Sequence, residues 1–333
     1  MRFCQLRLLT STIIFQKTTK TRYAIALKPL TVMLMSNKIS PRPALWLCYL
    51  NLCKSNVVIE MVFTAIVGML LATPNMPSIS LMLSASLGIA LAASSAAAIN
   101  HFVDREIDKQ LNPHRPIPMG YLLPKQVMLF ASIVGLLAML VLILWVNTLT
   151  ALLTFISLMG YAVIYTKYLK KLTSQNIVIG GLFGAAPPLL GWCAITNSIE
   201  PHALLLVLII FVWTPPHFWP LAIARLEKYQ QIYNDFKIPM LPVTHGIALT
   251  CLHCLLYVVL LFIVTLLPYL TAMSGLIYLS AIMLCNLGFL YFIVLMQRRP
   301  NKKNAMAAFW YSIIYVTLLF ALLLIDHYFL IRL

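Results

Sequence analysis

Nine apolar runs, each about as long as a membrane-crossing helix, account for most of this 333-residue sequence. A bilayer core needs about 20 consecutive, mainly apolar residues per helix. Hydrophobic residues make up 62% of the chain and charged residues 10%, which excludes an ordinary soluble domain. The sequence therefore predicts an all-α polytopic membrane protein, a nine-transmembrane-helix bundle within residues 45–333. The spans are expected at residues 56–73, 79–100, 124–146, 148–166, 176–196, 203–223, 247–270, 274–296 and 306–331.

The positions of Lys and Arg support this count and set an orientation. Four loops, at residues 101–125, 167–175, 224–246 and 297–305, carry Lys and Arg, whereas the alternate connections between spans carry none. Because Lys and Arg favour cytoplasmic loops, the N-terminus and these four loops are expected in the cytoplasm or the mitochondrial matrix. The net charge of +16 then follows from topology. Expected partners are the lipid bilayer and an anionic substrate, with no indication of nucleic acid.

Residues 1–44 differ from the rest, because they are basic and rich in hydroxyl groups, and no acidic residue occurs before Glu60. This segment is expected to be a disordered N-terminal extension. Its composition is typical of a mitochondrial transit peptide. A bacterial basic leader, or a start at Met33 or Met35, explains it as well, and the bacterial inner membrane is the favoured location over the mitochondrial one.

The densest cluster of acidic residues follows the second run. Three of the eight acidic side chains, Asp104, Glu106 and Asp108, fall within five positions after Asn100. On a helix, Asn100, Asp104 and Asp108 share one face, since residues four apart differ by only about 40° in direction. Acidic groups beside a membrane usually mark function, and Mg²⁺ is often held by one or two carboxylates with waters and phosphates. We call Asn100, Asp104 and Asp108 the acidic ladder. The ladder predicts a site for magnesium and phosphate, although a solvated loop would also carry acidic residues.

Two more polar segments are expected on the same face. The loop at residues 224–246 follows the sixth span, and Lys167, Lys170 and Lys171 follow the fourth. These lysines are candidate phosphate partners, although topology alone would also place lysines there. Pro and Gly inside the fifth and sixth spans predict bent helices around an internal pocket.

One histidine and one cysteine cluster require separate interpretation. His217, in the segment WTPPHFWP, is a candidate contact for a substrate carboxylate or an iron centre, or else a hydrogen-bonded structural residue. Cys251, His253 and Cys254 lie within a span and lack a second ligand pair, so they are expected to pack rather than to bind metal.

Three longer segments resemble a known family. The segments YTKYLKKLTSQNIVIGGLFGAAPPLLGW (165–192), WTPPHFWPLAIARLEKY (213–229) and IPMLPVTHG (238–246) are similar to protoheme IX farnesyltransferases, also called heme O synthases, of the UbiA-type intramembrane prenyltransferases. The resemblance runs from about residue 47 to the C-terminus. It implies a nine-helix bundle with cytoplasmic cap loops, Mg²⁺ as cofactor, and transfer of a farnesyl group from farnesyl diphosphate to the vinyl group of heme b. The product, heme O, carries a hydroxyl beside the new C–C bond.

The resemblance also implies roles for particular residues. The acidic ladder would hold the diphosphate through Mg²⁺, and basic residues would neutralise it. Contact with heme A synthase or with terminal oxidase assembly is a further expectation. Arg115, Lys167, Lys170 and Lys171 are the basic residues so implied, and the full set of candidate substrate-binding residues is Arg115, Lys167, Lys170, Lys171, Tyr165, His217, Glu227 and Tyr229.

Departures from the family pattern keep other functions open. In the first loop, Arg115 follows Asp108 about two residues earlier than in the family, as in chlorophyll synthases. In the second loop, Lys228 stands where the family has an acidic residue, so that Glu227 or Asp235 would supply the second set of metal contacts. Near the start, Lys54-Ser55-Asn56 replaces the Lys-Pro-Arg of the family.

The alternative functions are a UbiA-type enzyme with a chlorophyllide or quinone acceptor, a catalytically weakened heme-handling protein, and a transporter. A transporter is disfavoured, because its site would lie near the bilayer midplane.

Overall fold

A computed structural model describes residues 43–329, and in this part of the chain every regular element is a helix. The prediction of an all-α fold is confirmed. The order of the helices is α2 (Leu45–Leu52), α3 (Ser55–Leu71), α4 (Ile79–Val103), α5 (Arg105–Leu111), α6 (Pro124–Trp145), α7 (Thr148–Met159), η1 (Gly160–Leu169), α8 (Lys170–Leu172), α9 (Asn176–Gly184), α10 (Pro187–Thr196), α11 (Pro201–Ala224), α12 (Leu226–Phe236), α13 (Leu241–Thr244), α14 (Gly246–Val264), α15 (Leu267–Leu270), α16 (Leu276–Arg298) and α17 (Lys302–Tyr328).

Eight helices in the described residues are long and apolar enough to cross a membrane, and the count reaches nine if α2 and α3 form one span bent by 52°. The predicted nine-span pattern is therefore confirmed with one qualification, at the first span. There the chain bends at Lys54, which has a φ of 50° in the left-handed region. Non-glycine residues rarely adopt this conformation, and they often do so at functional sites.

Bent helices are predicted in the fifth and sixth spans, and of these two only the fifth span is broken. The fifth span breaks between α9 and α10, directly before Pro187. In contrast, α11 continues as one helix through Pro215, Pro216 and Pro220. The fourth span contains an unexpected π-helix, η1, in which the Thr166 hydroxyl donates to a carbonyl five residues earlier. Such π segments are often found at functional sites.

Small residues allow α3 and α10 to pack closely. A Cβ atom added at Gly68 would lie 2.2 Å from the Pro188 carbonyl oxygen, and one added at Gly191 would lie 1.9 Å from the Ala65 carbonyl oxygen. Contacts of this kind replace the hydrophobic effect between helices within a lipid environment. They fix α3 as one wall of the bundle interior.

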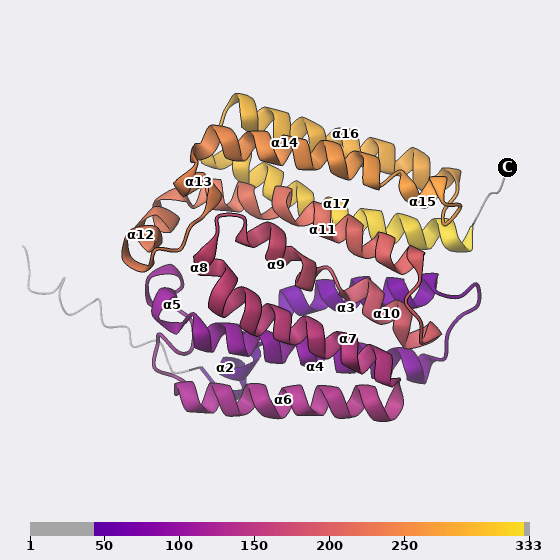
Figure 1. The fold of residues 1–333 in the computed structure, drawn as a ribbon, viewed down its shortest axis with the longest axis horizontal. Helices are drawn as coiled ribbons and strands as arrows, with labels where there is room; N and C mark the ends of the chain where they lie inside the picture. Colours follow the sequence, from indigo (N-terminus) through magenta and orange to yellow (C-terminus); the bar gives the residue numbers. More distant parts are fainter. Residues whose placement is uncertain (1–42, 330–333) are drawn as a thin grey trace, which may run out of the picture. The chain divides into compact units, whose positions relative to one another are not determined.

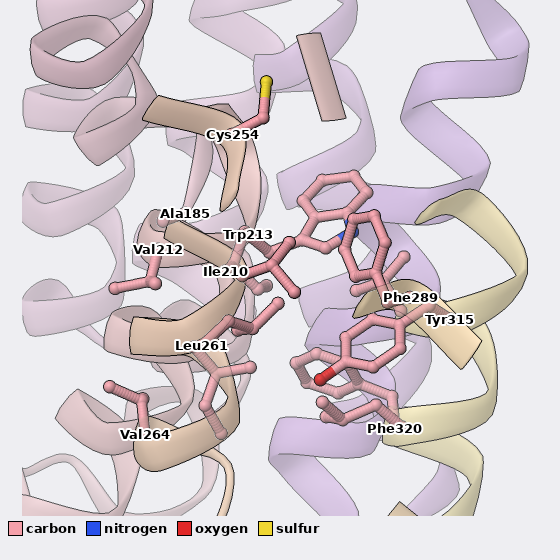
Figure 2. Packing of buried hydrophobic residues seen from close by; sticks show 14 of the residues in the cluster. Ala185, Ile210, Val212, Trp213, Cys254, Leu261, Val264, Phe289, Tyr315 and Phe320 are labelled. Carbon is pink, nitrogen blue, oxygen red and sulfur yellow. The ribbon is translucent and has the colours of Figure 1, made fainter. Parts of the chain in front are cut away.

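The main apolar core joins α11, α14, α16 and α17, and aromatic side chains fill its centre. Figure 2 shows Trp213, Phe289, Tyr315 and Phe320 converging there. One polar chain crosses this core: the Tyr315 hydroxyl donates to Asn286 Oδ1 over 2.6 Å, and Asn286 Nδ2 donates in turn to Thr265 Oγ1. Satisfying these buried polar groups fixes how the helices pack against each other.

The polar loops after α4 and α11 form a cap at one end of the bundle, where α5, α8, α12 and α13 gather (Figure 1). An apolar contact cluster of Ile107, Ile232 and Ile238 joins the two loops. Gln110 Nε2 also donates to Asp235 Oδ2 over 2.8 Å. The expected cap loops are therefore present and are packed against each other.

Candidate functional site

The acidic ladder lies on a nearly continuous helix. Although α4 ends at Val103, the Asp104 amide donates to the Asn100 carbonyl over 2.9 Å, and the Asp108 amide donates to the Asp104 carbonyl over 2.8 Å. The i to i+4 hydrogen bonds therefore run from α4 into α5, and the three ladder residues lie one turn apart. All three side chains are buried.

A different cation contacts each residue of the ladder. Lys170 Nζ lies 2.8 Å from Asp104 Oδ2, and the Arg115 guanidinium lies 2.6 Å from Asp108 Oδ2. Lys54 Nζ donates to Asn100 Oδ1 over 2.6 Å. Residues far apart in the sequence thus bring three positive charges to one row of oxygens, which is an arrangement suited to an anion with several oxygens.

The π-helix sets the orientation of the Asn100 amide. Thr166 donates its only hydroxyl hydrogen to the Tyr161 carbonyl over 2.8 Å. Its oxygen can therefore only accept from Asn100 Nδ2, at 3.4 Å, and the same amide nitrogen donates to Asp104 over 2.9 Å. The Asn100 oxygen is consequently left for the Lys54 cation or for a metal ion.

Of the three candidate lysines after the fourth span, the described structure brings only Lys170 to the ladder. Lys167 is exposed and lies 5.2 Å from the centre of the Tyr168 ring, and Lys171 is exposed beyond the end of η1. A phosphate-binding role for Lys167 and Lys171 therefore stays a prediction without geometric support.

The second loop approaches the ladder through Tyr229. Burial raises the pKa of the Tyr229 phenol, and the nearby Arg225 and Arg115 oppose this shift, so the hydroxyl remains a neutral hydrogen-bond donor beside the first loop. Glu227 and Asp235 are both exposed, and the Asp235 carboxylate already accepts from Gln110. The structure thus gives Asp235 a role in joining the loops, and its role as a metal ligand stays a prediction, as does that of Glu227.

A cavity of about 320 Å³ begins where the ladder meets the bundle interior. Lys54 lines this cavity and also binds Asn100, so the cavity and the ladder share one residue. Most of the wall is apolar. Tyr165 and Tyr161 stack against each other in this wall, with 5.5 Å between ring centroids. An apolar chamber below a polar, cationic mouth matches a substrate with a charged head and a hydrocarbon tail.

His217 lines the same cavity, and hydrogen bonding defines which ring nitrogen carries its proton. Its Nδ1 lies 2.7 Å from Ser312 Oγ, and the Ser312 hydroxyl donates its single hydrogen to the Phe309 carbonyl over 2.6 Å. Nδ1 must therefore be the donor to Ser312, since the hydroxyl has no second hydrogen. Neutral His217 then carries a lone pair on Nε2. The ring stacks between Trp213 and Phe309, which holds it in place.

Sequence reasoning missed Lys54 and Thr166 as site residues. The sequence places Lys54 in a segment that departs from the family pattern, and a lone lysine at the start of a span is a usable signal. Thr166 gave no signal, because it lies in the π-helix, which no residue pattern indicated.

Comparison with known proteins identifies the family to which the chain belongs. The model of the UbiA prenyltransferase family matches residues 61–314. The chain belongs to this family. It is 54% identical to a protoheme IX farnesyltransferase of Methylococcus capsulatus over 299 residues, which cover 88% of this chain and 99% of the relative. A protein of the same name from Legionella pneumophila is 54% identical over 289 residues, covering 86% of this chain and 97% of the relative.

Solved structures share the fold. A digeranylgeranylglyceryl phosphate synthase superposes with a TM-score of 0.70 at 21% identity, covering 86% of this chain and 99% of the other. A UbiA homologue from Archaeoglobus fulgidus, bound to GPP and Mg²⁺, gives a TM-score of 0.58 at 16% identity over 83% of this chain and 99% of that one. The family thus includes a member that holds a prenyl diphosphate together with Mg²⁺.

The residues present fit a magnesium ion that arrives with a diphosphate. The described residues contain no group of three or more His, Cys, Asp or Glu able to hold a metal by themselves. The ladder instead offers two carboxylates and one amide oxygen on a single helix face. Mg²⁺ is commonly bound by one or two carboxylates, with phosphates and waters completing the octahedron.

Proposed function

We propose that this UbiA-family enzyme transfers the farnesyl group of farnesyl diphosphate to the vinyl group of heme b and so makes heme O. The observation that carries the proposal is the row of two carboxylates and three cations at the mouth of a large apolar cavity. The near full-length similarity to protoheme IX farnesyltransferases directs the choice of substrates.

Asn100, Asp104 and Asp108 would hold Mg²⁺ and, through it, the diphosphate. The bound metal would supply positive charge to the leaving oxygens. Arg115 and Lys170 already lie within hydrogen-bond distance of the ladder carboxylates, and they would share their N–H groups with the phosphate oxygens. Preplaced donors of this kind stabilise charge that develops as the allylic C–O bond breaks.

The cavity wall would protect the farnesyl cation. The stacked rings of Tyr161 and Tyr165 present aromatic faces near the ladder end of the cavity, and aromatic faces stabilise cations. The apolar lining keeps stray water away until the C–C bond has formed. Phe183 and Trp213 extend this lining deeper into the bundle.

His217 would position the acceptor. Its Nε2 lone pair is the form of imidazole that binds iron, and its Nδ1–H is already held by Ser312, as ligand histidines usually are. We therefore assign His217 to the iron of heme b. Replacing His217 with Ala should change the absorption spectrum of bound heme and weaken heme binding. Replacing the exposed His245 should change neither, and a spectrum unaltered by the His217 substitution would contradict the assignment.

An acceptor competition tests the proposed reaction. The purified chain in lipid vesicles would receive farnesyl diphosphate, Mg²⁺ and equal amounts of heme b, a chlorophyllide and a quinone-ring acceptor. Farnesylated heme as the dominant product supports the proposal. A prenylated chlorophyllide or quinone would transfer the function to the other acceptor, and no prenylated product would favour the heme-handling alternative.

The length and apolar character of the helices make the chain an integral membrane protein. We place it in a bacterial inner membrane, with its N-terminus and cap in the cytoplasm, on the strength of the Lys and Arg pattern. The mitochondrial inner membrane is the alternative. Residues 1–42, on which the transit-peptide interpretation depends, lie outside the described residues. Contact with heme A synthase or terminal oxidase assembly remains a prediction.

A further inference from the structure

Glu60 is a carboxylate within an apolar span, and neither the ladder nor the proposed acceptor contact uses it. It lies in α3 and lines the cavity together with Val57 and Thr64. Among the described residues it has no hydrogen-bond or ion-pair partner. An ionisable residue inside a membrane span is costly and usually has a function, so the position of Glu60 requires an explanation.

The position of Glu60 along α3 places it below the ladder. Lys54, which binds Asn100, precedes Glu60 by six residues, and six residues of helix span about 9 Å. C1 of the farnesyl group must leave the diphosphate and meet the acceptor below the metal site. Glu60 therefore lies near the level at which the new carbon–carbon bond would form.

The cavity opens beside Glu60. Val57, Glu60 and Phe218 all line the cavity and are also exposed, so its wall reaches the protein surface there. The rest of the lining is largely apolar and would exclude water. The Glu60 carboxylate offers hydrogen-bond acceptors for a water molecule at this opening, in a wall that is otherwise largely apolar.

The proposed reaction requires such a water molecule and a base. Diphosphate leaves with the electron pair of the C1–O bond, and C1 then bonds to the outer vinyl carbon, which leaves a positive charge on the inner vinyl carbon. A water oxygen donates its electron pair to that carbon and forms the C–O bond of the product. One O–H bond of that water breaks, and its proton must pass to a base.

Few groups of the described cavity wall can accept this proton. The hydroxyls of Thr64, Ser157 and Thr214 donate to backbone carbonyls. The wall also includes Thr154, Tyr161 and Tyr165, but hydroxyls are weak bases. Lys54 is held as a donor to Asn100. Only the Glu60 carboxylate and the His217 imidazole remain as basic groups in this wall, and His217 is assigned to the heme iron.

On the basis of the proposed function, we propose that Glu60 holds the water that captures the cation and accepts its proton. Without Glu60 no water is held beside the cation, so the outer vinyl carbon instead loses a proton to the departed diphosphate, and its C–H electron pair forms an alkene one water lighter than heme O. The two products differ in mass. Glu60 thus controls which product forms after the C–C bond, and it does not affect the ionisation of farnesyl diphosphate.

The test compares products from the unmodified chain, Glu60→Gln and a control, Glu106→Gln, in vesicles with farnesyl diphosphate, Mg²⁺ and heme b. Glu106 is exposed on the cap, and the hydrogen bond from Lys109 lowers the pKa of its carboxyl, so the control removes the same charge outside the cavity. General bases typically contribute 10²- to 10⁴-fold, so Glu60→Gln should raise the alkene-to-alcohol ratio by about 10-fold or more. Total prenylated heme should remain within about threefold of the unmodified chain, since ionisation does not depend on this base.

Three results would overturn this role: an unchanged product ratio in Glu60→Gln, an equal change in Glu106→Gln, or loss of all prenylated heme from a folded Glu60→Gln protein. A shift that appears only on His217 substitution would move the base role to that residue. If the unmodified chain itself makes no prenylated heme, the proposed function fails, and the Glu60 role fails with it.

A second measurement uses only the unmodified chain and does not depend on whether the variant folds. In deuterated water, transfer of the water proton to Glu60 slows capture of the cation, so the proportion of alcohol should fall relative to alkene. An unchanged proportion would mean that no base takes part in the capture step, and it would overturn the proposal.

Discussion

Lys170 and Lys171 are neighbours in the sequence, but the structure separates their roles. Lys170 Nζ lies 2.8 Å from Asp104 Oδ2 with 19% of its side chain exposed, whereas Lys171 is exposed at the end of the span. Each lysine adds one positive charge to this loop, so both contribute equally to the charge pattern that sets the membrane orientation. Replacing each with Gln therefore compares one charge at the site with one outside it.

The expected magnitude follows from the Lys170 contact. A hydrogen bond to a charged group is worth about 1.5–3 kcal/mol, and partial exposure favours the lower half of that range, about 1.5–2 kcal/mol. Since about 1.4 kcal/mol corresponds to a tenfold change in rate, Lys170→Gln should lower kcat/KM by roughly 10- to 30-fold. Lys171→Gln should change kcat/KM by less than about threefold, because an exposed charge is well screened.

The assay measures farnesylated heme formed by each variant in vesicles, normalised to the amount of folded protein. Lys170→Arg should recover part of the activity, since it keeps a cation near Asp104. Equal losses in Lys170→Gln and Lys171→Gln would refute the reasoning, because general loop charge, and not contact with the ladder, would then account for the effect.

Other substitutions and conditions give distinct outcomes. Gly180→Ala would place a Cβ atom 2.2 Å from Tyr165 Cδ2, so the Tyr165 ring must move; we expect a loss of about 1–3 kcal/mol in stability, seen as a lower Tm, together with reduced farnesylation. Asp326→Ala should lower the Tm without lowering activity per folded molecule, because the buried Asp326 carboxylate accepts from the Gly275 and Tyr278 amides far from the site. Chelation of divalent metal should abolish farnesylation, and added Mg²⁺ should restore it; activity that survives chelation would contradict a metal-held diphosphate.

The spans and the ladder could be predicted from the sequence because both depend on local patterns. Apolar runs mark helices directly, and residues four apart share a helix face whatever surrounds them. Asn100, Asp104 and Asp108 accordingly lie where their spacing indicated, one turn apart and buried.

The partners of the ladder could not be predicted in the same way. Lys170, which lies 2.8 Å from Asp104, directly follows η1, and no residue pattern indicated the π-helical winding of η1. Similarly, the break in the fifth span and the continuity of α11 depend on which neighbouring groups satisfy the backbone around proline, and that is a property of packing. Glu60 gave only a general signal, as an acidic residue within the span predicted at 56–73, because its chemistry depends on the cavity beside it.

The most direct test of the proposed reaction uses membranes of a host that lacks heme O synthase, expressing either the unmodified chain or Asp104→Asn. Pigments would be extracted, and heme b would be separated from heme O by chromatography and mass. The substitution removes a charge that Asn100 and Lys170 contact at the polar end of the bundle, so the fold should persist. Heme O formed only by the unmodified chain is the expected result. Heme O formed equally by both, or by neither despite correct membrane insertion, would contradict the assignment.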